Sequence, residues 1–122
     1  MPRPSVRRDC RLYLDDILEA IAKIDRYSAG LSFEEFRDDD RTFDAVVRNL
    51  EIIGEASKNI PDPIRLRHPG VEWKRIAGLR DVVAHGYFGV DAEIVWDVVR
   101  SKLPHLREMI AAMAALEERD QA

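Results

Sequence analysis

The chain has 122 residues, of which 46% are hydrophobic and 34% are charged, and its net charge is −4. These values are typical of one globular domain spanning residues 1–122, and no run approaches the ~20 apolar residues of a membrane helix. The acidic charge argues against a protein that coats nucleic acid non-specifically. The N-terminus lacks a secretory apolar segment, and the single Cys10 suggests neither an intrachain disulfide nor a metal site. We therefore expect a cytoplasmic protein without a cofactor.

The first half of the chain predicts three helices. Apolar residues recur at three- and four-residue steps over residues 7–29, and Gly30 should stop that helix. Ser32 and Glu35 fit a capping box for a short helix. The acidic run 38–40 then supplies the N-cap of a long helix. Its apolar face contains Phe43, Val46, Val47, Leu50, Ile53 and Ala56.

The next segment predicts a short helix and then a longer one. The long helix before it should end before Pro61, and Asp62 followed by Pro63 is typical of an N-cap with a first-position proline. The short helix closes at residues 68–70. A helix from about residue 72 then buries four apolar side chains, namely Trp73, Ile76, Leu79 and Val83.

The last third predicts one long helix with an interruption. Asp91 should cap this helix, and Pro104 should kink or split it. The apolar stripe contains Ile94, Val95, Val98, Val99, Leu103, Leu106, Ile110, Met113 and Leu116. Four substantial helices with short connections predict an all-α, antiparallel four-helix bundle with extra short helices.

The segment LRDVVAHGYFGVD carries the strongest chemical signal. It places Arg80, His85 and Tyr87 in the order R-x4-H-x-Y, at a helix end that Gly86 and Gly89 should terminate. A cation can hold phosphate oxygens, and an imidazole can move protons near neutral pH. This combination suits phosphate chemistry, although a capped helix end with a structural histidine fits the pattern equally well.

Two further features surround the motif. Asp81 lies four residues before His85, so its carboxylate can fix the imidazole tautomer. The preceding segment carries excess positive charge that could steer an anionic ligand to the motif. Its members before the motif are Arg65, Arg67, Lys74 and Arg75, against the single acid Glu72. The alternative is that these side chains form ordinary solvated helix faces.

Other conspicuous residues favour structural interpretations. Trp73 and Trp96 are expected to pack in the core or at a subunit interface. His68 and His105 are expected to be surface histidines. No pattern of paired carboxylates would complete a di-iron site.

Nearly the whole chain resembles the HepT family of minimal HEPN domains. The resemblance is carried by NLEIIGEASKNIP, by HPGVEWKRIAGLRDVVAHGYFGVD and by a last helix with a proline in its middle. The R-x4-H-x-Y element is that family's signature, and Arg80, His85 and Tyr87 match it. The resemblance implies a HEPN-type helical fold, a homodimer whose motifs face a shared cleft, and metal-independent endoribonuclease activity attributed to the arginine and histidine.

The resemblance also implies a partner. In this family a small MNT-type nucleotidyltransferase serves as the antitoxin of a toxin–antitoxin pair and transfers AMP to the motif tyrosine, here Tyr87. The alternative function is a non-catalytic HEPN module that binds a nucleotide or the transferase. The single imidazole per motif and the acidic net charge favour that alternative. No base-reading pattern indicates which RNA would be cut.

Overall fold

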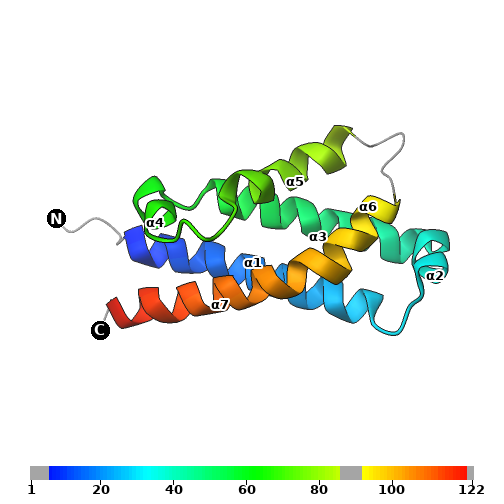
Figure 1. The fold of residues 1–122 in the computed structure, drawn as a ribbon, viewed down its shortest axis with the longest axis horizontal. Coiled ribbons are helices and arrows are strands. Elements are labelled where there is room, and N and C mark those ends of the chain that lie inside the picture. Colours follow the sequence, from blue (N-terminus) through cyan, green and yellow to red (C-terminus); the bar gives the residue numbers. More distant parts are fainter. Residues whose placement is uncertain (1–5, 86–91, 121–122) are drawn as a thin grey trace.

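The computed structural model describes residues 6–85 and 92–120, with side chains for residues 10–79 and 92–117. These ranges contain helices and turns but no strand, which confirms the all-α class. The long helices are α1 (Val6–Ser28), α3 (Asp40–Lys58), α5 (Trp73–His85) and α7 (Leu103–Asp120). The short helices α2 (Phe33–Asp38) and α4 (Asp62–Arg67) lie at opposite ends of the bundle (Figure 1).

Successive long helices run in opposite directions, as predicted (Figure 1). Helix α1 packs against α3 and α7, and α3 also packs against α5. Buried apolar side chains of these helices form one connected core, in which α1 and α3 supply Leu14, Ile17, Ile21, Ile24, Val46, Leu50 and Ile53. No helix in the described part of the chain is both long enough and apolar enough to cross a bilayer.

Local signals placed the first helix boundaries correctly. Gly30 follows α1 with φ +75°, a left-handed conformation that suits glycine. The Ser32 hydroxyl accepts from the Glu35 amide at 3.1 Å, and the Ser32 amide donates to the Glu35 carboxylate at 3.0 Å. Asp39 caps α3 by accepting from the Thr42 amide at 3.1 Å. Each cap satisfies an amide that the helix itself leaves unpaired, so these predictions are confirmed.

The predicted cap of α4 was wrong by one residue. Pro61 is the N-cap, and Asp62 is already the first helical residue, with no side-chain cap bond. The Asp62 carboxylate instead forms an ion pair with Arg65 one turn later. Residues three positions apart on a helix lie side by side, so the Asp62 carboxylate pairs with Arg65 along the helix surface and does not cap the helix end.

The last helix is interrupted where Pro104 predicted it. Helix α6 (Ala92–Asp97) passes into a π-helical turn, η1 (Val98–Lys102), and α7 then begins at Leu103. The Leu103 amide donates to the Val98 carbonyl, five residues back. Pro104 has no amide hydrogen, so it cannot donate the next hydrogen bond of a regular α-helix. The wider π-helical turn before it accommodates this missing bond.

The apolar stripe of α7 ends differently from the prediction. Leu116 was expected to continue the stripe after Met113, but its side chain is 47% exposed, whereas Glu117 is 2% exposed. The Arg67 guanidinium donates to one oxygen of the Glu117 carboxylate at 3.0 Å, and the Nε2 atom of His68 lies 3.2 Å from the other oxygen. These partners allow a carboxylate to occupy a core position four residues after Met113.

This buried ionic cluster also corrects the expectation for His68. Its side chain is mostly buried against Glu117 and is therefore not a surface histidine. The Cys10 thiol of α1 lies in the same region, and burial raises its pKa to about 11, with the negative charge of Glu117 acting in the same direction. The ionic contacts of the cluster thus join the end of α4 to the end of α7.

The two tryptophans pack as predicted. The indole N–H of Trp73 donates to the carbonyls of Arg65 at 3.2 Å and His68 at 3.1 Å, so α4 holds the first residue of α5. Trp96 contacts the ring of Phe36, with centroids 5.1 Å apart, and the Arg100 guanidinium lies 4.4 Å from its ring centre. Trp73 is the more consequential of the two, because it fixes the start of α5.

We predict that Glu117→Gln lowers the free energy of unfolding by about 2 kcal/mol, because the amide keeps the shape but loses two charge-assisted contacts. Glu108→Gln, at an exposed position of the same helix, is the matched control and should change stability little. Urea unfolding followed by circular dichroism measures both. Equal stability of the two variants would contradict the role of the cluster.

We also predict that Trp73→Phe lowers the free energy of unfolding by about 1–2 kcal/mol, since phenylalanine keeps an aromatic ring but cannot donate to the carbonyls of Arg65 and His68. Trp96→Phe is the control, because the Trp96 indole N–H has no hydrogen-bond partner among the described residues. Thermal unfolding of both variants compares them. A larger loss for the Trp96 variant would show that ring size, and not the hydrogen bonds, dominates at Trp73.

Candidate functional site

The candidate motif lies at the end of α5. The described backbone is helical through Arg80, Asp81 and His85, and His85 is the last residue of α5. The predicted termination of this helix by Gly86 and Gly89 falls on residues outside the described part and stays a prediction. The side chains of residues 80–85 and the whole of residues 86–91, including Tyr87, lie outside the described part. The mutual geometry of Arg80, Asp81, His85 and Tyr87 therefore stays a prediction.

The four basic residues predicted to steer an anionic ligand differ in their ion-pair partners. Arg67 is committed to the buried Glu117, which makes it a structural cation. Arg75 forms an exposed ion pair with Glu72 at 3.3 Å. Arg65 pairs with Asp62, and Lys74 has no ion pair with a described residue. The structure therefore gives different partners to residues that the sequence presented as a single basic segment.

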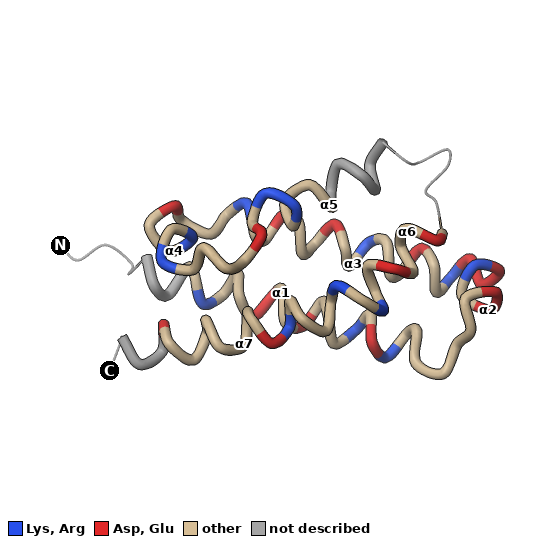
Figure 2. Tube along the Cα trace, in the orientation of Figure 1, with Lys and Arg blue, Asp and Glu red and all other residues tan. Residues whose placement is uncertain are grey.

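Arg65 and Lys74 do meet, in a hollow of about 730 Å³ between the end of α3, α4 and the start of α5. Lys58, from the last turn of α3, adds a third cation to its wall. Figure 2 shows basic positions along α4 and again at the start of α5. Leu66 and Trp73 contribute apolar surface to the same hollow. We call this feature the α4 hollow.

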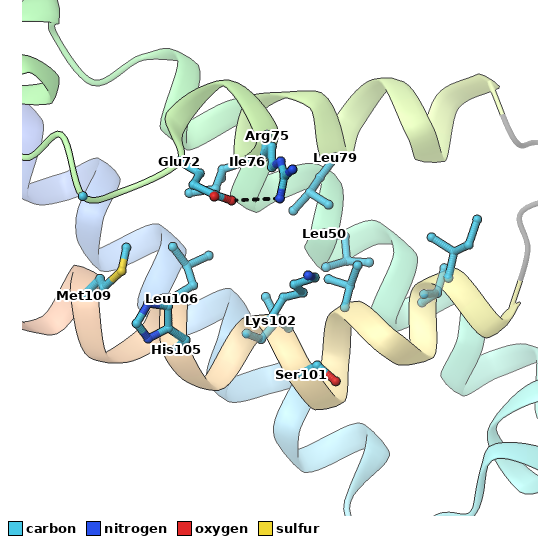
Figure 3. A pocket seen from close by; sticks show the side chains of 15 residues that line it. Leu50, Glu72, Arg75, Ile76, Leu79, Ser101, Lys102, His105, Leu106 and Met109 are labelled. Carbon is cyan, nitrogen blue, oxygen red and sulfur yellow. Dashed lines mark hydrogen bonds and ion pairs between the residues drawn. The ribbon is translucent and has the colours of Figure 1, made fainter.

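A second feature, the α5–α7 groove, runs along the other side of α5 (Figure 3). It has a volume of about 570 Å³ and a mainly apolar wall. Ile76 and Leu79 come from α5, and Leu106 and Met109 come from α7. Its polar rim has Glu72 and Arg75 on one side and Lys102 and His105 on the other (Figure 3).

Neither feature resembles a metal centre. No group of three or more histidine, cysteine, aspartate or glutamate side chains within the described ranges is arranged to hold a metal ion. His105 is exposed on α7, as predicted, and His68 is held by Glu117.

The sequence interpretation missed Lys58 and Glu117. Lys58 lies sixteen positions before Lys74, on another helix, so no periodicity connects the two residues. Glu117 did carry a signal, because it lies four residues after the buried Met113 and thus in the apolar register of α7.

Comparison with known proteins places the chain in a family. The model of the family described as "Ribonuclease HepT-like" matches residues 17–113. A protein of Thermococcus cleftensis named "Probable ribonuclease HepT" is 44% identical over 102 residues, which cover 84% of this chain and 93% of the relative.

Two further relatives span almost their full length. One, from Methanocaldococcus jannaschii, is 40% identical over 116 residues, covering 94% of this chain and 96% of the relative. Another, from Caldanaerobacter subterraneus, is 41% identical over 108 residues, covering 88% and 96%. The names of both contain the word RNase. No solved structure gives a significant match. The chain belongs to the HepT-like ribonuclease family, whose HEPN-type helical fold agrees with the bundle described above.

Proposed function

We propose that this chain is a metal-independent endoribonuclease and the toxin of a toxin–antitoxin pair. The observation that carries the proposal is the family match over residues 17–113, which includes the helical part of the R-x4-H-x-Y motif. Helix α5 supports it, because Trp73 and the packing against α3 hold the helix on which Arg80 and His85 lie. The alternative, a non-catalytic HEPN module, is the outcome that the test below distinguishes.

The proposed reaction is attack by the RNA's own 2′-hydroxyl. The 2′-oxygen loses its proton to a base and bonds to phosphorus, while the bond from phosphorus to the 5′-oxygen breaks and that oxygen takes up a proton. The products are a 2′,3′-cyclic phosphate and a 5′-hydroxyl. His85 serves as the proton-transfer group, Asp81 orients it, and Arg80 stabilises the charge on the non-bridging oxygens.

One imidazole per motif favours a homodimer, since a two-fold axis brings a second copy of His85 to supply the other proton transfer. The α5–α7 groove supports this arrangement. It exposes apolar surface along the helix that carries the motif, and Ile94 at its edge is half exposed. Its rim carries both charge signs, so a two-fold related copy could place Glu72 against Lys102 of its mate.

Regulation is proposed to act on Tyr87 through an MNT-type nucleotidyltransferase. The phenolic oxygen attacks the α-phosphorus of ATP, pyrophosphate leaves, and the phenolic proton passes to a base of the transferase. The resulting phosphodiester places a negative charge and an adenosine near Arg80. Both would compete with RNA phosphate for the same cation.

The proposal predicts that Arg80→Ala and His85→Ala each lower the rate of RNA cleavage by at least about 100-fold, because each removes a group that acts in the transition state. Arg48→Ala, at an exposed position of α3, is the control. The assay uses labelled RNA with a chelator present, and circular dichroism confirms folding. Wild-type rates in a folded His85 variant would favour the non-catalytic alternative.

For regulation we predict that Tyr87→Phe abolishes AMP transfer by the co-expressed transferase while RNA cleavage persists. Tyr27→Phe is the control, because Tyr27 is 40% exposed on α1 and far along the sequence from the motif. Intact-mass measurement followed by peptide mapping detects the modification. Full inhibition of the unmodified Tyr87 variant by the transferase would point to inhibition by binding alone.

A further inference from the structure

The α4 hollow carries more positive charge than its surroundings neutralise. Lys58, Arg65 and Lys74 line it from three different helices, and Asp62 is the only acidic residue among the described residues of its wall. Asp62 is paired with Arg65, whereas Lys58 and Lys74 form no ion pair with any described residue. Two lysines from separate elements thus line a common space in which the one carboxylate among the described lining residues, that of Asp62, is paired with Arg65. An anion is the natural occupant of such a space.

The remaining surface of the hollow is apolar and includes an aromatic side chain. Leu66 is 78% exposed, so its side chain is not part of the core, and it lines the hollow. Trp73 lines the hollow as well, and its hydrogen bonds to the carbonyls of Arg65 and His68 hold the indole in place. Apolar and aromatic surface next to unpaired cations suits an unpaired nucleotide, which presents a flat base beside its phosphates.

The hollow also lies in line with the motif. Lys74 is the second residue of α5 and His85 is its last, so the two positions are eleven residues apart. Eleven residues make three helical turns with nearly the same register, and they span about 16 Å along the axis. A single strand that follows α5 could therefore occupy the hollow and reach the motif with a few nucleotides between them.

We infer that the α4 hollow is an RNA subsite that holds an unpaired nucleotide a few positions away from the cut phosphate. Lys58 and Lys74 contact its phosphates, and Leu66 and Trp73 contact its base. The inference rests on the proposed ribonuclease function and adds a length requirement to it. RNA long enough to reach both the motif and the hollow binds more tightly than RNA that reaches only the motif.

The test uses the double variant Lys58→Gln/Lys74→Gln and a control of equal charge change, Lys23→Gln/Arg26→Gln on α1. Binding is measured in the non-cleaving Arg80→Ala/His85→Ala background with a fluorescent single-stranded twelve-nucleotide RNA. We expect about a tenfold loss of affinity and a shallower salt dependence for the hollow variant, and little change for the control.

Cleavage supplies a second readout, in the chain with an intact motif. The hollow variant should lose about tenfold in kcat/KM on the twelve-nucleotide RNA, mainly through KM, and should cleave a dinucleotide at the wild-type rate. A dinucleotide is too short to occupy both places. Equal losses on both substrates would show that the substitutions damage the motif through the fold, and would overturn the subsite.

The two readouts separate the subsite from the ribonuclease itself. If the wild-type chain cuts no RNA, the proposed activity fails, yet the binding assay still decides whether the hollow holds RNA. Affinity equal to that of the control overturns the inference. So does a result in which the hollow variant binds RNA normally but loses binding to the partner transferase, because the hollow would then be a surface for an acidic protein segment.

Discussion

The buried carboxylate of Glu117 is the constraint on which the arrangement of the site depends. A charge at 2% exposure is costly unless partners compensate it, and here Arg67 and His68 are the partners that the structure describes. Arg67 is the last residue of α4 and His68 is its C-cap, so the carboxylate holds the end of α4 against α7. Trp73 then bonds to carbonyls of that same segment and fixes the start of α5. The position of the motif helix therefore follows from an ionic contact far from the motif.

Most of the fold could be predicted because its signals are local. Gly30, the capping box of Ser32 and Glu35, and the Asp39 cap each act within four residues of the boundary they set. The interruption before Pro104 follows from the missing amide of proline. Features that depend on distant residues were not predictable in this way. At the end of α7 the buried position is occupied by Glu117 and not by the predicted Leu116. The burial of this carboxylate depends on Arg67 and His68, which lie about fifty positions away in the sequence.

The candidate site also combines features that are visible in the local sequence with features that depend on distant residues. The order of Arg80, His85 and Tyr87 is visible in the sequence, and so is the excess of basic residues before them. Which partner each basic residue has depends on tertiary packing. Arg67 pairs with the buried Glu117, and Arg75 pairs with Glu72. Lys74 lines the α4 hollow together with Lys58. A count of charge in a segment therefore overestimates the number of cations that lack an ion-pair partner among the described residues. In this chain the cations of the hollow come from three helices and could be assembled only from coordinates.

The central claim is that RNA is cut by its own 2′-hydroxyl with groups of the α5 motif alone. The most direct measurement is the chemistry of the new ends, determined by mass spectrometry of RNA fragments produced in the presence of a chelator. Attack by the 2′-hydroxyl predicts 2′,3′-cyclic phosphate and 5′-hydroxyl ends, with an undiminished rate in the presence of the chelator. Ends with a 3′-hydroxyl and a 5′-phosphate, or cleavage that stops when the chelator is added, would contradict it.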